Sequence, residues 1–210
     1  MEKILFQGDS ITDWFRIKDN DSILGSNYVN MVAGEIGLRY PNEYEFINRG
    51  IGGNRSIDIL ARTQTDIISL KPDYLSMLVG VNDVWHAAKF GYDVNPERYE
   101  LYFNTIIQDV KKNLPNTKIM IMEPFILKGS VAMQKPNIFI DGVNKLAQIS
   151  RKIASNNNIV FVALQERFDK MLKYAPVEYW SSDGVHPNAP GHCIIKNAWI
   201  EAFERLRDSY

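Results

Sequence analysis

The chain has 210 residues, of which 45% are hydrophobic and 23% are charged, a composition typical of a globular domain with one core. Its formal net charge of −1 argues against a basic surface for nucleic acid or for an anionic membrane. The only cysteine, Cys193, leaves no intrachain disulfide to form. The N-terminal segment lacks the apolar core of a signal peptide, and no segment is apolar enough over its length to span a membrane. We therefore expect a cytoplasmic protein.

Strand and helix patterns alternate along the whole chain. In chain order, we expect a strand at 3–7, a helix at 27–38, a strand at 45–48, a helix at 56–69, a strand at 74–79, a helix at 96–113, a strand at 118–122, a helix at 137–155, a strand at 159–164 and a helix at 189–208. This alternation predicts an α/β fold, with a five-stranded parallel sheet covered by helices on both faces. Right-handed crossovers favour the flavodoxin-like strand order 2-1-3-4-5 in a single domain over residues 1–210.

Three polar blocks interrupt this pattern, at residues 8–13 (GDSITD), 80–83 (GVND) and 183–187 (DGVHP). The first two follow the first and third predicted strands, and the last block comes just before the final helix. Open α/β sheets gather their chemistry at the carboxyl ends of strands, beside the point where the strand order reverses. The expected order therefore brings Ser10 and Asn82 together.

Ser10, Asp183 and His186 are the residue types of a catalytic triad. A serine hydroxyl is a weak nucleophile and needs a general base, which the imidazole of His186 supplies. Asp183 lies three residues before His186, so one turn allows its carboxylate to orient the ring. Each block alone also fits a turn or a helix cap, but their joint presence favours acyl transfer.

An oxyanion hole for such a reaction needs preorganised hydrogen-bond donors. The backbone N–H of Ser10 and the side-chain amide of Asn82 are two candidates. A third lies in the glycine-rich turn at 48–54 (NRGIGGN), where glycine permits close approach. The same turn could instead form a phosphate-binding nest before a helix, although it lacks the G-x-G-x-x-G spacing and a Walker lysine.

The blocks resemble those of the GDSL/SGNH hydrolases, and the resemblance extends over nearly the whole chain. It implies the SGNH hydrolase fold, no cofactor, and site residues at Ser10, Gly53, Asn82, Asp183 and His186, with Ser10, Gly53 and Asn82 as the oxyanion hole. Ile11 stands where the family name carries leucine, an exchange of one apolar residue for another. The G-x-S-x-G elbow is absent, which argues against the ordinary α/β-hydrolase fold.

Within that family, the chain is most similar to intracellular bacterial acetylxylan esterases. The shared stretches are residues 8–13, 71–73 (KPD), 80–85 (GVNDVW), 185–187 and 191–192. This resemblance implies removal of acetyl groups from xylo-oligosaccharides and a homo-oligomeric assembly.

Three tryptophans lie within a few residues of the catalytic blocks: Trp14, Trp85 and Trp180. Indole faces stack on sugar rings, so we expect these residues to bind substrate, although they could also simply fill the rim of the core. The fourth, Trp199, lies in the final helix and is expected in the core. The apolar segment 124–136 is expected to wall the acyl pocket, contact another subunit or pack on its own domain.

His86 and His192, together with Asp183 and His186, raise the question of a metal site. No pair of them has a compact zinc spacing, and serine hydrolysis needs no metal, so we expect none. The sequence thus predicts a serine carboxylester hydrolase that deacetylates a small acetylated sugar through an acyl-enzyme. Two alternatives stay open: a short-chain lysophospholipase or thioesterase, and a non-enzymatic sugar- or nucleotide-binding module.

Overall fold

A five-stranded parallel sheet forms the centre of the molecule in the computed structural model, which describes residues 1–208. The strands are β1 (Glu2–Gly8), β2 (Tyr44–Asn48), β3 (Tyr74–Leu78), β4 (Lys118–Met122) and β5 (Val160–Val162). They are arranged in the order β2-β1-β3-β4-β5, with every neighbouring pair parallel. The predicted fold class and strand order are therefore confirmed.

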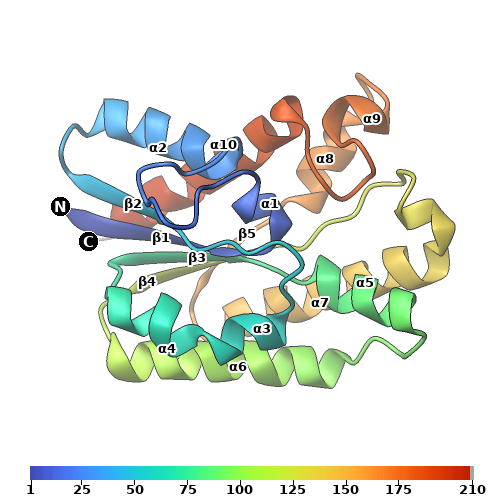
Figure 1. Ribbon diagram of the computed structural model, residues 1–210, viewed down its shortest axis with the longest axis horizontal. Coiled ribbons are helices and arrows are strands. Elements are labelled where there is room, and N and C mark those ends of the chain that lie inside the picture. The colour runs from blue at the N-terminus through green and yellow to red at the C-terminus, as the bar shows by residue number, and fades with distance from the viewer. Residues whose placement is uncertain (209–210) are drawn as a thin grey trace.

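Helices cover both faces of this sheet (Figure 1). One layer contains α2 (Tyr28–Arg39) and α10 (Ala189–Arg207), and the other contains α3 (Ser56–Ala61), α6 (Pro96–Asn113) and α7 (Pro136–Asn156). The remaining helical segments are α1 (Ser10–Asp13), α4 (Thr63–Asp66), η1 (Ile68–Leu70), α5 (Val81–Phe90), η2 (Ala132–Gln134), α8 (Gln165–Met171) and α9 (Val177–Trp180). No helix within residues 1–208 is long and apolar enough to cross a membrane.

The central strands are buried along most of their length because helices cover both of their faces. In β1, Ile4 and Phe6 belong to the core under α2 and α10, whereas Leu5 belongs to the core under α6 and α7. Trp199 is fully buried and stacks on Phe203 with 5.1 Å between ring centroids, as expected for a core tryptophan. The two cores fix the position of the ends of β1 and β3, where the first two polar blocks lie.

The structure differs from the sequence prediction mainly around the site. The helix expected at 56–69 is broken into α3, α4 and the short turn η1, because the backbone leaves the helical conformation at Arg62 and again at Ile67. The short helices α1, α5, α8 and α9 were not predicted, since their polar residues read as loops. As a result, Ser10 and Asn82 lie in the first turns of α1 and α5 rather than in loops.

The apolar segment 124–136 packs on its own domain. Phe125 and Leu127 are buried in one core and Ile126 in the other. Its backbone also contacts the third polar block, since the Leu127 N–H donates to the Gly184 carbonyl at 2.8 Å. This segment therefore supports the turn that carries the candidate base.

Candidate active site

Ser10 is the first residue of α1, directly after β1. Asp9 caps that helix, with its Oδ1 accepting a hydrogen bond from the Ile11 N–H at 3.0 Å. The tight exit from β1 requires glycine at position 8, because a Cβ there would lie 2.4 Å from the Thr12 Oγ1. Ser10 itself remains partly exposed, so its hydroxyl is accessible from the carboxyl end of the sheet.

Asp183 and His186 share one turn, which the aspartate itself organises. Its Oδ1 accepts the N–H groups of Val185 and His186, each at 2.8 Å, and its Oδ2 lies 2.7 Å from the His186 Nδ1. The His186 Nε2 lies 2.9 Å from the Ser10 Oγ. Carboxylate, imidazole and hydroxyl therefore form a continuous chain of hydrogen bonds, the arrangement of a catalytic triad.

These contacts keep the carboxylate charged. Burial raises the pKa of Asp183, but the hydrogen bonds from the His186 ring and from the backbone N–H groups of His186 and Val185 outweigh it and lower the pKa to about 2. Hydrogen bonds to the charged form stabilise it. Asp183 is thus an anion at any pH near neutrality and can stabilise a positively charged imidazole.

The turn that carries Asp183 and His186 is held in place from both sides. Ser181 pairs with Pro187 in a short antiparallel bridge, and its Oγ donates to the His186 carbonyl at 2.9 Å. Gly129 lies so close that a Cβ would come within 2.4 Å of the Asp183 backbone. Gly184 adopts φ +93°, in the left-handed region that favours glycine. The position of the imidazole is therefore determined by packing as well as by Asp183.

The predicted oxyanion donors lie on separate elements. Asn82 is buried at the start of α5, and its Nδ2 donates one hydrogen bond to the Asn54 carbonyl at 3.2 Å. An amide nitrogen carries two hydrogens, so the second remains for an oxyanion. Gly53 is exposed with φ +82°. Within residues 1–208, the N–H groups of Gly53 and Ser10 donate no hydrogen bond to the protein, so both remain free to bind an oxyanion.

Arg62 fixes the glycine-rich turn from behind. Its guanidinium donates to the Asn54 Oδ1 at 2.9 Å and to the Arg49 carbonyl at 2.8 Å. Arg62 interrupts the helix expected at 56–69, as described above. The broken helix therefore supplies the cation that holds Asn54, and Asn54 in turn orients the Asn82 amide.

The three tryptophans expected to bind substrate occupy different environments. Trp14 stacks on the His186 ring, with 5.2 Å between centroids and 29° between planes, and Trp85 lies 5.9 Å from the same ring at 50°. Trp180 is only 7% exposed and donates its indole N–H to the Ala175 carbonyl at 3.1 Å. Two indoles thus flank the candidate base, whereas the third is part of the core.

Sequence reasoning gave no role to Asp9 and Asp83, which lie next to Ser10 and Asn82 inside the blocks. Asp9 is fully buried, and burial raises its pKa to about 7. Asp83 accepts hydrogen bonds from the Ser56 N–H at 3.0 Å and the Ser56 Oγ at 2.6 Å, and burial raises its pKa to about 6. Asp83 therefore ties the start of α3 to the start of α5. The only sequence signal was their position next to Ser10 and Asn82.

The remaining histidines do not join the triad. His192 is buried on α10, where its Nδ1 accepts the Tyr28 N–H at 3.2 Å, and burial lowers its pKa to about 4. His86 lies edge-on to Phe90. Within residues 1–208, no group of three or more histidine, cysteine, aspartate or glutamate side chains is arranged to hold a metal ion.

The sequence model of the GDSL-like lipase/acylhydrolase family matches residues 6–194, a range that contains all three polar blocks. The chain belongs to this family. An acetylxylan esterase from Geobacillus stearothermophilus is 32% identical to it over 98% of this chain and 96% of the relative. The family and this relative together show that the chain is a carboxylic ester hydrolase.

Solved structures agree with that assignment. A structure described as a GDSL-like lipase from Parabacteroides merdae has a TM-score of 0.91 and 36% identity, and covers 96% of this chain and 94% of its own. A catalytic mutant of the Geobacillus acetylxylan esterase Axe2 has a TM-score of 0.85 and 31% identity, with 96% and 93% coverage.

Proposed function

We propose that Ser10, Asp183 and His186 form the catalytic triad of this esterase, and that Ser10, Gly53 and Asn82 form its oxyanion hole. The continuous hydrogen-bonded chain from Asp183 through His186 to the Ser10 Oγ carries this proposal. The Axe2 mutants described as catalytic support it, because they replace a serine, an aspartate and a histidine three positions after that aspartate. The spacing is the same as in this chain.

In the first half-reaction, the Ser10 Oγ attacks the ester carbonyl while the His186 Nε2 accepts its proton. The carbonyl oxygen becomes an oxyanion, to which the N–H groups of Ser10 and Gly53 and the Asn82 amide donate. The ester C–O bond then breaks, and His186 returns the proton to the leaving alcohol oxygen. Water attacks the acyl-enzyme in the same way, which releases the acid and restores Ser10.

The substrate class that we propose is acetylated xylo-oligosaccharides or similar acetylated sugars. The similarity to an acetylxylan esterase supports this class, and so do the two indoles beside His186. An indole face binds the apolar face of a sugar ring. We drop Trp180 from the set of residues expected to bind sugar, because its buried side chain offers no face to a ligand.

A substrate panel tests the proposal. We expect acetylated xylo-oligosaccharides and p-nitrophenyl acetate to be hydrolysed, and p-nitrophenyl octanoate, an acyl thioester and a lysolipid to be poor substrates. Faster turnover of lysolipid or thioester would favour the alternative activities instead. A stoichiometric organophosphate label on Ser10 would exclude a module that only binds sugars or nucleotides.

The oligomeric state and the cellular location of the chain are also proposed here. We propose a homo-oligomer in the cytoplasm, without nucleic acid or membrane partners, and with no cofactor for the reaction. Light scattering on the purified chain measures the mass directly, and a monomer would overturn the first of these. Fractionation of the producing cells tests the second.

A further inference from the structure

Phe15 combines two unfavourable features at the edge of the site. Its side chain is 76% exposed, although burying a phenyl ring is worth about 1.5–3 kcal/mol. Its backbone has φ 61°, in the left-handed region. A bulky residue there is a genuine outlier and costs on the order of 1–3 kcal/mol. Neither feature helps the chain to fold.

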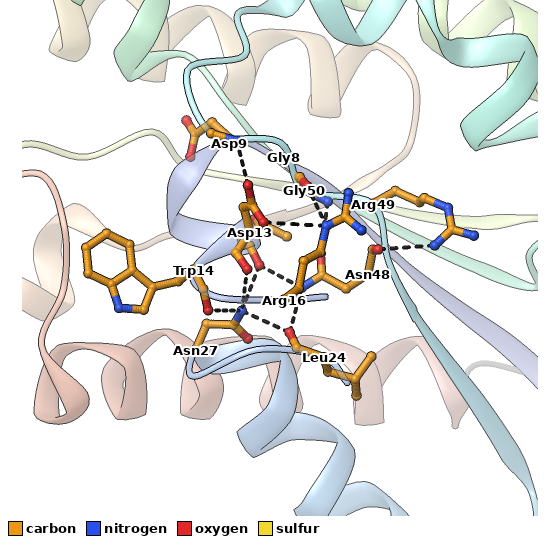
Figure 2. A network of polar contacts seen from close by, with 12 residues as sticks. Gly8, Asp9, Asp13, Trp14, Arg16, Leu24, Asn27, Asn48, Arg49 and Gly50 are labelled. Atoms are coloured by element: carbon orange, nitrogen blue, oxygen red, sulfur yellow. Dashed lines mark hydrogen bonds and ion pairs between the residues drawn. The ribbon is translucent and has the colours of Figure 1, made fainter. Parts of the chain in front are cut away.

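The surrounding loop holds this conformation firmly. The Asn27 amide donates to the carbonyls of Thr12 and Leu24 at 2.8 and 3.0 Å. Directly after Phe15 in the sequence, the Arg16 Nε donates to the Gly50 carbonyl at 2.6 Å. Figure 2 shows this network, with the Trp14 indole pointing away from it. A strained backbone persists only where surrounding contacts hold it in place. The hydrogen bonds of Asn27 and Arg16 are such contacts.

The ring lies next to the residues that line the site. Phe15 packs edge-on to Trp14, with 5.5 Å between centroids and 75° between planes. Trp14 in turn stacks on His186. Phe15 is therefore the next aromatic ring outward from the base, beyond Trp14. A ligand bound at Ser10 that extends past Trp14 on this side would meet it.

We propose that Phe15 is a specificity-determining residue that binds the sugar unit adjacent to the acetylated one. This inference rests on the proposed function and adds to it a preference for oligosaccharides over single sugars. The exposed phenyl ring offers an apolar face to a pyranose ring. Because the ring already packs edge-on against Trp14, less conformational entropy is lost when the second sugar binds.

The test is the ratio of kcat/KM for acetylated xylotriose to kcat/KM for acetylated methyl xyloside. Phe15→Ala should lower this ratio about three- to ten-fold, the worth of one aromatic contact, mainly through a higher KM for the trisaccharide. Phe15→Trp should restore it. Leu38→Ala is the matched control, because Leu38 is 82% exposed on α2, and it should leave the ratio unchanged.

Two further variants separate the ring from the backbone. Phe15→Gly should lose the same selectivity as Phe15→Ala but have a higher Tm, because glycine accepts positive φ without steric cost. An unchanged ratio in Phe15→Ala would overturn the inference. So would a change in oligomer mass in that variant, since Phe15 would then contact another copy of the chain.

The failure of this inference differs from the failure of the proposed function. If the wild-type enzyme hydrolyses both acetylated sugars and Phe15→Ala keeps their ratio, only the role of Phe15 is wrong. If it hydrolyses p-nitrophenyl acetate but neither sugar, the proposed substrate class is wrong as well.

Discussion

On one side of Ser10, Asp183 and His186 come from a single turn in which the carboxylate binds its own backbone and the imidazole. On the other side, Gly53 and Asn82 come from two segments that only the strand order brings together. Asp183 and His186 form the proposed proton-relay side, which is therefore built by a local turn. Gly53 and Asn82 belong to the proposed oxyanion side, which is built by the strand order and by buried polar contacts.

This difference affects how each side tolerates change. A local turn keeps its geometry as long as its own hydrogen bonds and the contact with Gly129 survive. The Asn82 amide depends on a longer chain of contacts, through Asn54 and then Arg62. We expect substitutions on the proton-relay side to affect chemistry directly, and substitutions behind Asn82 to act at a distance.

The largest effect should come from Ser10 itself, which both sides serve. Ser10→Ala removes the nucleophile and should lower kcat for p-nitrophenyl acetate by roughly four orders of magnitude or more. Circular dichroism and Tm should remain close to those of the wild type, because Ser10 is partly exposed. Near wild-type turnover in a folded variant would remove Ser10 from the mechanism.

On the proton-relay side, His186→Ala should be almost as damaging as Ser10→Ala, because His186 is the proposed acceptor of the serine proton. Asp183→Asn should leave measurably more activity, since Asp183 orients and stabilises the ring without accepting the proton. Single-turnover rates of the two variants decide the order. Equal losses would show that Asp183 does more than orient the ring.

The pKa of Asp183 adds a pH test to this pair. The carboxylate is stabilised in the folded protein, so its contribution to stability is present above its unfolded pKa of 3.8 and is lost as the pH falls toward 2. Asp183 therefore stays ionised between pH 7 and 5, and its protonation causes no loss of activity in that range. A free energy of unfolding that does not decrease between pH 4 and pH 2 would contradict this shift.

On the oxyanion side, Asn82→Ala should cost about 2.7–4 kcal/mol of transition-state stabilisation, a loss of about 10²–10³ in kcat. The effect belongs to kcat because the amide binds charge that develops only in the transition state. Steady-state kinetics with p-nitrophenyl acetate separate kcat from KM. An effect on KM alone would place Asn82 in ground-state binding.

Asp9 is fully buried next to Ser10. It allows a test of protein stability rather than of reaction rate. Its pKa of about 7 lies above 3.8, so the folded protein keeps this proton while the unfolded chain loses it. Asp9 therefore makes the free energy of unfolding fall as the pH rises from about 4 to 7. Asp9→Asn should flatten this trend in urea denaturation curves. An unchanged slope would mean that Asp9 is ionised in the folded protein.

Sequence patterns predicted the sheet order and placed Ser10, Asp183 and His186 in one site, because apolar runs report strands and the D-x-x-H spacing is local. They did not predict α5, since the polar residues of its first turn resemble a loop. They also placed Trp180 on the site, because closeness in sequence to His186 does not report which way a side chain points. The burial of Asp9 and the hydrogen bonds between Asp83 and Ser56 depend on tertiary contacts that no local pattern encodes.

The smallest expected effect on catalysis concerns Trp85, whose indole lies beside His186. Trp180, whose indole lies in the core, serves as the comparison. Trp85→Ala should reduce kcat/KM for acetylated xylotriose several-fold more than for p-nitrophenyl acetate, because the small ester has no sugar ring to stack. Trp180→Ala should instead cost roughly 3–5 kcal/mol of stability, as for other buried aromatic residues. Its folded fraction should keep the wild-type ratio between the two substrates. The ratio and Tm are measured for both variants. A shifted ratio in Trp180→Ala with an unshifted ratio in Trp85→Ala would reverse the assignment, and the sugar would then bind on the α9 side of His186.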